Sequence, residues 1–485
     1  MKRDKYLIKA LNTCIIGLSL ISVMMCLIKN PKGYGLLFLL PLVYCICYLT
    51  CFQTSQRHSL TCLFINICAF LRYVILPLIY SIEPVYGFSA YSCTDPKILN
   101  RAILLMGYEL AVVTIFVATY AFLHPNRSIS DASDKSEIEL GVKKKNKFFG
   151  IIIFLIVAIF LVAQTPSVLD QINFLWLKSD TGDRVGSIAA EAGAFEMLIR
   201  QVLIIAILSM FVVLVSKIKE RNEKNEKKAL VISLIFAALC TCIIISEQRS
   251  SQIYCAFAAI ILLVRLYPKR KGIIVASIVS VCIFVVALLT IYKTFFAFKY
   301  DSYYDAINAE EINLKTLAQN LEVYLLGPQT VAASIEFAEI GNFTFSQFVY
   351  DFQRSFIGLS FFVKGSDTYI TSESYNLFVT DLAATSGYLL PLTGNAYGFV
   401  GFLFSPCLIC MVYWLAFKLE RIMLKSKVEY IVFFAAYVYI RLATCMVFSN
   451  LATILNVISS ILISAGVVYV FQFFVECLLR RKRIA

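Results

Sequence analysis

The sequence predicts an all-α polytopic membrane protein with about twelve transmembrane helices, both termini in the cytoplasm and one long, partly helical outer loop. The chain has 485 residues, of which 60% are hydrophobic and only 15% are charged. Its mean hydropathy is +0.78. This composition lies outside the range of soluble globular proteins. Apolar stretches long enough to cross a hydrocarbon core of ~30 Å recur along the chain.

The apolar stretches define twelve expected spans. In chain order they cover residues 11–28, 34–52, 60–82, 102–123, 148–168, 196–216, 229–246, 252–267, 272–293, 398–418, 428–447 and 452–478. The first has no small-residue cleavage site and is followed directly by more spans, so we interpret it as an uncleaved anchor.

The basic residues predict the topology. About two thirds of the 44 Lys and Arg residues fall in the short segments on one side if the N-terminus is inside. The positive-inside rule then places these segments and both termini in the cytoplasm. Because the basic blocks are short and border the membrane, the net charge of +13 is a topology signal, and no nucleic-acid partner is expected.

Five regions follow from this threading. They are residues 1–124 with spans one to four, a cytoplasmic linker at 125–147, residues 148–293 with spans five to nine and an outer loop at 169–195, a large outer loop at 294–397, and residues 398–485 with the last three spans and a basic tail. The large loop carries apolar residues at helical spacing, so helices are expected within it.

Among the arginines that fall on the wrong side for the positive-inside rule, in outer loops or in outer halves of spans, six are candidate site residues. They are Arg72, Arg184, Arg200, Arg249, Arg354 and Arg441. A cation there is costly unless it has an anionic partner. Because a guanidinium is a planar fork that grips two oxygens, the cluster predicts a phosphate or diphosphate substrate at the outer face.

Three polar constellations surround these arginines. The first is the loop after span five, with Asp183, Arg184 and Glu191, followed by Arg200 at the mouth of span six. A polar loop whose charges pair with one another is an equally weighted alternative. The second is the tight turn 246–251 with Glu247 and Arg249, where a plain hairpin needs no such charged pair.

The third constellation lies in the large loop and at its exit. Asp351 and Arg354 stand in the loop, and Asn395 and Tyr397 belong to the Gly-rich stretch 394–401 that leads into span ten. Glycines allow close approach of backbone to a ligand. Packing of two helices is the alternative explanation.

Some of the ionisable residues inside expected spans fall in the outer halves of those spans. Arg72, Glu109 and Arg441 all fall in outer halves. Arg72 and Glu109 lie at similar depths on successive spans, so a buried ion pair between them is the alternative to a substrate role. That pair would leave Arg441 without an obvious partner.

The sequence also lacks several kinds of site. Its two histidines, His58 and His124, map to the cytoplasmic edge, so no histidine-based acid, base or metal site is expected on the outer face. No P-loop, dinucleotide fingerprint or Asp-x-Asp motif occurs. We therefore expect no cofactor and a substrate that is already activated in the membrane.

The layout of twelve spans with enlarged third and fifth outer loops resembles the Wzy-type O-antigen and capsule repeat-unit polymerases. Short patches at 72–77, 247–249 and 394–401 are similar to patches of that family. The resemblance implies a multi-pass enzyme of the bacterial inner membrane that joins polyprenyl-diphosphate-linked oligosaccharide units. It implies membrane lipid, a flippase and a chain-length regulator as partners.

The resemblance also implies site residues. Family members use arginines of the two outer loops, and Arg184 and Arg354 occupy those loops here. We expect Arg184, Arg249, Arg354 and Glu247 to be catalytic. Substrate-binding residues are expected to be Arg72, Arg200, Arg441, Asp183, Asp351, Asn395 and Tyr397. A lipid-linked oligosaccharide flippase and an O-antigen ligase-like transferase are the alternative functions.

Overall fold

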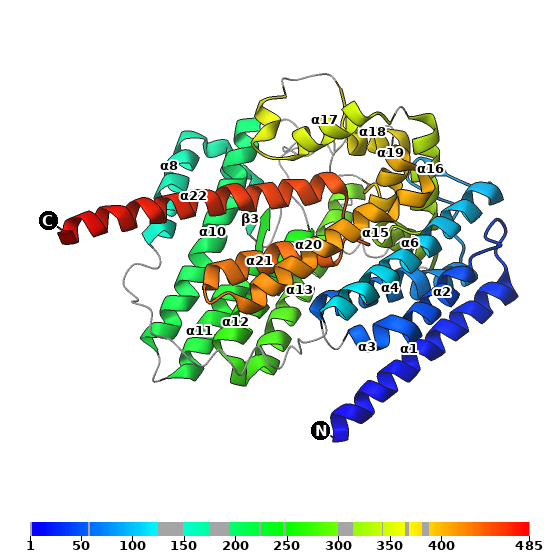
Figure 1. Cartoon of the computed structure of the whole chain (residues 1–485), viewed down its shortest axis with the longest axis horizontal. Helices are drawn as coiled ribbons and strands as arrows, with labels where there is room; N and C mark the ends of the chain where they lie inside the picture. Colours follow the sequence, from blue (N-terminus) through cyan, green and yellow to red (C-terminus); the bar gives the residue numbers. More distant parts are fainter. Residues whose placement is uncertain are drawn as a thin grey trace.

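The structure is a computed structural model. It describes residues 2–56, 59–124, 149–174, 194–222, 225–245, 249–298, 314–341, 343–363, 368–380 and 388–484. These residues form a mostly helical protein with two small antiparallel sheets (Figure 1).

The helices of the described residues fall into three stretches of the chain. The first contains α1 (Lys2–Lys29), α2 (Leu39–Cys47), the π-helix η1 (Tyr48–Phe52), α3 (Gln53–Ser55), α4 (Leu60–Phe70), the π-helix η2 (Leu71–Ile75), α5 (Leu76–Ile82) and α6 (Pro96–Leu123). The second contains α8 (Phe149–Gln164), the 3-10 helix η5 (Pro166–Gln171), α10 (Ala194–Arg221), α11 (Glu226–Thr241), α12 (Arg249–Leu266), the 3-10 helix η6 (Pro268–Arg270) and α13 (Lys271–Phe298). The third contains α15 (Leu314–Leu325), α16 (Pro328–Ile340), α17 (Phe345–Ser355), the 3-10 helix η7 (Leu359–Phe361), α18 (Thr371–Thr380), α19 (Leu392–Phe404), α20 (Pro406–Lys425), α21 (Glu429–Ala443) and α22 (Leu451–Ile484).

Each sheet has two short strands. In the first, β1 (Gly87–Phe88) and β2 (Tyr91–Ser92) form a hairpin between α5 and α6. In the second, β3 (Ile172–Phe174) pairs with β4 (Ile243–Ile245) in the register Ile172 to Ile245. This second sheet joins segments that are distant in sequence, because β3 follows α8 and β4 follows α11.

Several helices are long and apolar enough to cross a membrane. Among the described residues these are Ala10–Lys29, Leu60–Ile82, Pro96–Leu123, Leu198–Arg221 and Pro268–Ala287, and the bent pair α19–α20 makes a sixth if it is counted as one span. The all-α fold and a multi-pass membrane association are thereby supported. The count of twelve spans and their orientation stay predictions, since the other expected spans coincide with shorter or bent helices.

Two expected spans have the wrong boundaries. Span 398–418 is not one straight helix, because α19 and α20 meet at an angle of 111°. The bend coincides with Gly401, which has φ of +73°, and with Pro406 in the first turn of α20. Glycine tolerates this left-handed backbone without strain, and proline begins a new helix readily. Span 229–246 is shorter than expected, since α11 ends at Thr241 and the chain continues as β4.

One end of the helix bundle gathers the ends of α4, α10, α12 and α20. Glu420 of α20 caps α4 by accepting hydrogen bonds from the Leu60 backbone N–H at 2.7 Å and from the Thr61 hydroxyl at 2.6 Å. The Arg265 guanidinium of α12 donates to the carbonyl of Met423 at 3.2 Å. Lys219 of α10 donates to the carbonyl of Leu266. Three basic segments, at 217–228, 265–271 and 418–427, therefore share one end of the molecule, which we call the basic end.

The helices of the large loop lie at the opposite end. In Figure 1, α17 and α18 are at the top of the view and the connections at the far ends of α11 and α12 are at the bottom. The loop region bonds to two of the spans: the Tyr80 hydroxyl of α5 donates to Glu322 of α15, and the Ile357 N–H donates to the Ser459 hydroxyl of α22 at 3.0 Å. The loop is thus a packed layer of helices, which we call the loop end.

Helix α16 packs closely against α19 because both present small residues. A Cβ added at Gly394 would lie 2.2 Å from the Ser334 Oγ and 2.5 Å from its Cβ. Contacts this short do not occur between real atoms, so Gly394 sets the distance between these helices. The Gly-rich stretch is helical here, which agrees with the packing interpretation for Gly394.

We predict that Gly394→Ala destabilises the protein by about 1–3 kcal/mol, because the added methyl group overpacks the α16–α19 contact. The measurement is thermal unfolding in detergent. Gly272→Ala is the matched control, since nothing lies within 4 Å of a Cβ at that helical position. Equal midpoints for the two variants would contradict the packing argument.

Candidate functional site

A buried ion pair joins Arg72 and Glu109 near the loop end. The Arg72 Nη1 lies 2.7 Å from the Glu109 Oε1, and both residues are 1% exposed. The Tyr73 hydroxyl donates to the same carboxylate at 3.3 Å. The Thr393 hydroxyl of α19 donates to its other oxygen at 2.5 Å. The carboxylate therefore binds groups from two separate parts of the chain, η2 and α19.

Arg72 also anchors the loop end. Its Nε donates to the carbonyl of Leu326 at 3.0 Å. Leu326 connects α15 to α16 and has φ of +52°, a left-handed backbone that is unusual for a bulky residue. Such a conformation persists where the surroundings hold it. The bond from Arg72 to this carbonyl is one such restraint, so the guanidinium has a structural role between α5, α6 and the loop helices.

A second buried carboxylate, Glu322, lies beside this anchor. It is 0% exposed and accepts hydrogen bonds from the Thr330 N–H at 2.6 Å, the Thr330 hydroxyl at 2.9 Å and the Tyr80 hydroxyl. Burial raises the pKa of the Glu322 carboxyl, and the hydrogen bonds from Tyr80 and Thr330 oppose this rise. Sequence reasoning missed Glu322, because an amphipathic helix in a loop gives no sign that its charged residue faces inward.

Arg441 is the buried arginine that lacks an anionic partner among the described residues. It lies in the last turn of α21, is 8% exposed, and makes no hydrogen bond or ion pair to any described residue. Its guanidinium stacks on the ring of Tyr254 in α12, with 5.0 Å from Cζ to the ring centroid. A buried cation with only a ring contact has most of its donors available for a ligand.

Other buried polar atoms without partners belong to the tyrosine on which Arg441 stacks and to the connection that follows α21. Within the described residues, the Tyr254 hydroxyl, the Ser449 Oγ and the Asn450 Nδ2 have no hydrogen-bond partner. Ser449 and Asn450 belong to the buried connection that follows α21. Each of these groups can donate a hydrogen bond to a ligand. We call Arg441, Tyr254, Ser449 and Asn450 the donor group.

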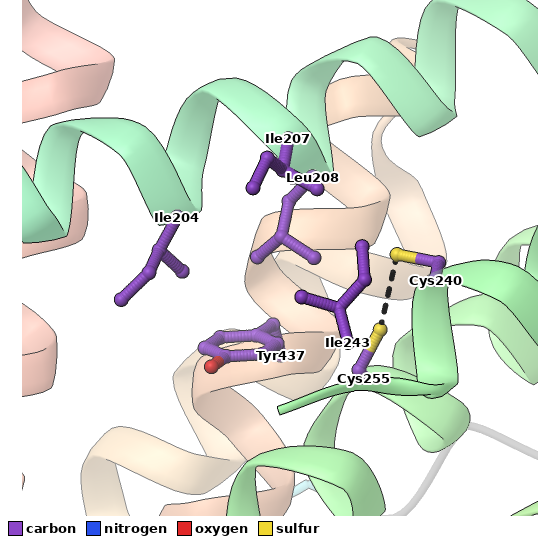
Figure 2. A pocket seen from close by; sticks show the side chains of 7 residues that line it. All are labelled: Ile204, Ile207, Leu208, Cys240, Ile243, Cys255 and Tyr437. Atoms are coloured by element: carbon purple, nitrogen blue, oxygen red, sulfur yellow. Dashed lines mark hydrogen bonds between the residues drawn. The ribbon is translucent and has the colours of Figure 1, made fainter. Parts of the chain in front are cut away.

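The ring of Tyr437, which contacts the Tyr254 ring of the donor group, packs against apolar side chains. Tyr437, one helical turn before Arg441, contacts the Tyr254 ring edge-on with centroids 6.2 Å apart. Figure 2 shows Tyr437 below Leu208, with Ile204 to one side and the facing thiols of Cys240 and Cys255 to the other. The cavity between them measures only about 10 Å³ and has apolar walls. It is too small for a ligand, so the space beside Tyr437 is core.

The other expected residues of the large loop have varied surroundings. Arg354 is exposed at the end of α17 and makes no contact with Arg72 or Arg441. Asp351 is buried, and its Oδ1 accepts hydrogen bonds from the Thr371 N–H at 3.0 Å and the Gln347 amide at 2.8 Å. Burial raises the pKa of the Asp351 carboxyl. This carboxylate caps α18, so we regard it as structural.

The two expected residues of α19 differ from each other. Asn395 is buried, and its Oδ1 has no partner within the described residues. The Tyr397 hydroxyl accepts a hydrogen bond from Arg101, which also pairs with Glu339 of α16. The Arg101–Glu339 pair is about half exposed, and Arg101 is not among the expected site residues. Arg200 lies near the start of α10 and is partly buried.

The remaining expected residues lie outside the described part of the chain. They are Asp183, Arg184, Glu191, Glu247 and the side chain of Arg249. The structure does describe the segments that precede these residues in the chain. Strands β3 and β4 pair the chain that leads into the first constellation with the chain that leads into the second.

No family model, curated protein or solved structure matches this chain. The assignment of a function therefore depends on the residues and on the resemblance of short patches.

We predict that Glu109→Gln and Arg72→Met each destabilise the protein by about 3–5 kcal/mol, because each leaves one buried charge without its partner. The double variant Arg72→Met/Glu109→Leu should recover part of the loss. Thermal unfolding in detergent measures these differences.

The exposed pair offers the matched control. Arg101→Met should cost less than about 1 kcal/mol, since an exposed ion pair contributes little. A similar cost for Arg72→Met and Arg101→Met would contradict a structural role for the buried pair.

Proposed function

We propose that this protein polymerises polyprenyl-diphosphate-linked oligosaccharide units at the outer face of the bacterial inner membrane. The observation that carries the proposal is the surroundings of Arg441: a buried guanidinium without an anionic partner among the described residues, stacked on Tyr254, whose buried hydroxyl also has no partner among them. A diphosphate supplies the oxygens that such donors need. The resemblance to Wzy-type polymerases supports the same substrate.

The distribution of buried charge favours a one-sided enzyme over a transporter. The buried ionisable residues among the described Asp, Glu, Lys and Arg are Arg72, Glu109, Glu322, Asp351, Glu420 and Arg441. Only Glu420 lies at the basic end, where it caps α4. A transporter needs polar groups reachable from both sides through its centre. The concentration of charge at the loop end suits a reaction at one membrane face.

The proposed reaction needs no nucleotide. A sugar hydroxyl of one lipid-linked unit attacks the anomeric carbon of the glycan on a second lipid. The new C–O bond forms as the bond to the diphosphate breaks, and the diphosphate oxygen takes the bonding electrons. Charge on this leaving group grows in the transition state, so a guanidinium placed there lowers the barrier. We assign this role to Arg441, with Arg184, Arg249 and Arg354 as further candidates.

A carboxylate takes the proton of the attacking hydroxyl in this mechanism. Asp183, Glu191 and Glu247 remain the candidates. Asp351 is a weaker candidate, because its Oδ1 already accepts two hydrogen bonds.

We predict that the basic end faces the cytoplasm and the loop end faces outward. A reporter enzyme active only in the cytoplasm should give signal when fused at Ser426, between α20 and α21, and none when fused at Gly341, after α16. Opposite signals would place the donor group at the cytoplasmic face and contradict the proposed reaction.

We predict that Arg441→Lys keeps the protein folded but lowers polymerisation about a hundredfold, which corresponds to ~3 kcal/mol for one lost transition-state donor. An ammonium retains the charge and the contact with Tyr254, but it cannot grip two oxygens. Cells should carry lipid-linked single units on the outer leaflet and no polymer ladder. Leaflet-specific labelling and gel analysis of the glycan measure both.

Arg421→Lys is the matched control. The Arg421 guanidinium also stacks on a tyrosine ring, that of Tyr120 at 5.3 Å, but at the basic end. It should polymerise normally. Single units trapped on the cytoplasmic leaflet in Arg441→Lys would indicate a flippase, and a normal ladder would remove Arg441 from the reaction.

A further inference from the structure

A second and larger apolar cavity lies along α21, on the side of Ala435, Val438 and Leu442. Its volume is about 370 Å³, and its walls come from α8, α10, α20, α21 and α22. The only hydroxyls among its lining residues are those of Ser209 and Tyr430. The volume is more than twice the ~150 Å³ of a cavity that stays dry and binds benzene. It has room for roughly a dozen carbon atoms.

The shape of the cavity suits a chain that runs along the membrane normal. On α21 its lining extends from Tyr430 near the basic end to Leu442 near the loop end. At 1.5 Å per residue, these twelve steps span about 18 Å. The deep wall is buried, with Ala435 and Leu442 at 7% and 1% exposure. Leu462 of α22, on the rim, is 59% exposed, so the cavity opens to the lipid-facing surface.

The upper end of the cavity adjoins the donor group. Leu442 lines the cavity, and its neighbour Arg441 faces Tyr254. Residues 435, 438 and 442 share one face of the helix, whereas 437 and 441 share the adjoining face. An anionic head bound at Arg441 therefore places the start of its hydrocarbon chain beside the Leu442 end of the cavity.

We propose that this cavity holds the first isoprene units of a single-chain isoprenoid diphosphate, with the diphosphate at Arg441. The assignment rests on the proposed function, because that function supplies the carrier lipid. A single chain fits, since the described residues at the upper end offer one guanidinium and the cavity is one continuous groove. The cavity determines which lipid carrier the enzyme accepts, independently of the sugars.

The experiment uses a polyprenyl diphosphate without sugar, carrying a photoreactive diazirine in its second isoprene unit. The full-length protein in nanodiscs is irradiated with this probe, and labelled peptides are mapped by mass spectrometry. Label is expected on the segments around Ser209, Ala435 and Ile461, and excess phosphatidylglycerol should not remove it. Label spread evenly over exposed helix faces, or removed by phosphatidylglycerol, would overturn the isoprenoid assignment.

Variants that fill the cavity are the second part of the labelling experiment. Ala435→Trp and the smaller change Val438→Phe should lower labelling at least tenfold, because the added rings occupy the groove. Ala118→Trp, at an exposed position on the span Pro96–Leu123, is the matched control and should label normally. Unchanged labelling in folded Ala435→Trp or Val438→Phe would overturn the proposal.

The two proposals fail in different ways. Cavity labelling in a wild-type protein that makes no polymer would contradict the polymerase function and keep the lipid site. Normal polymerisation without cavity labelling would contradict the lipid site alone.

Discussion

The bond between Arg72 and Glu109 is the interaction on which the arrangement of the loop end depends. It connects α6 to the π-helical segment before α5, and each partner has a second bond, Arg72 to Leu326 and Glu109 to Thr393. The pair thereby holds the α15–α16 turn and the start of α19 against the spans. A charge in an apolar environment is costly when alone, so these four groups favour a single arrangement.

The two buried arginines at the loop end have different surroundings, and this difference is the basis of the proposed site. Arg72 has a carboxylate and a carbonyl, whereas Arg441 has a tyrosine ring and no anion among the described residues. A guanidinium is more weakly hydrated than an ammonium, so it can be buried more easily. A buried guanidinium still requires a hydrogen-bond acceptor. An anionic ligand at Arg441 would complete the same kind of pairing that Glu109 provides for Arg72. The adjoining apolar cavity would then hold the hydrocarbon chain of that ligand.

The sequence predicted the helical class, the membrane character and the burial of Arg72, Glu109 and Arg441 at one end. These follow from hydropathy and from where charges interrupt apolar runs. It left open whether Arg72 pairs with Glu109, because equal depth on two spans does not determine whether the spans are neighbours. The pairing depends on the packing of α4, η2 and α6, which is a tertiary property.

Other features of the fold and of the candidate site could not be predicted from the sequence. The burial of Glu322 depends on which face of α15 meets α5, and Glu420 acts as a helix cap for a residue some 360 positions earlier. The 111° bend at Gly401 and Ser405 interrupts a run that reads as one apolar span. The donor group itself is assembled from α12, α21 and the connection after α21, so only Arg441 could be singled out in advance.

The most direct test of the central claim is an experimental structure of the full-length protein in nanodiscs with a polyprenyl diphosphate bound. The account predicts phosphate density within hydrogen-bonding distance of the Arg441 guanidinium and a hydrocarbon chain entering the groove beside Leu442. A carboxylate of the protein bonded to Arg441, with the diphosphate bound elsewhere, would contradict it.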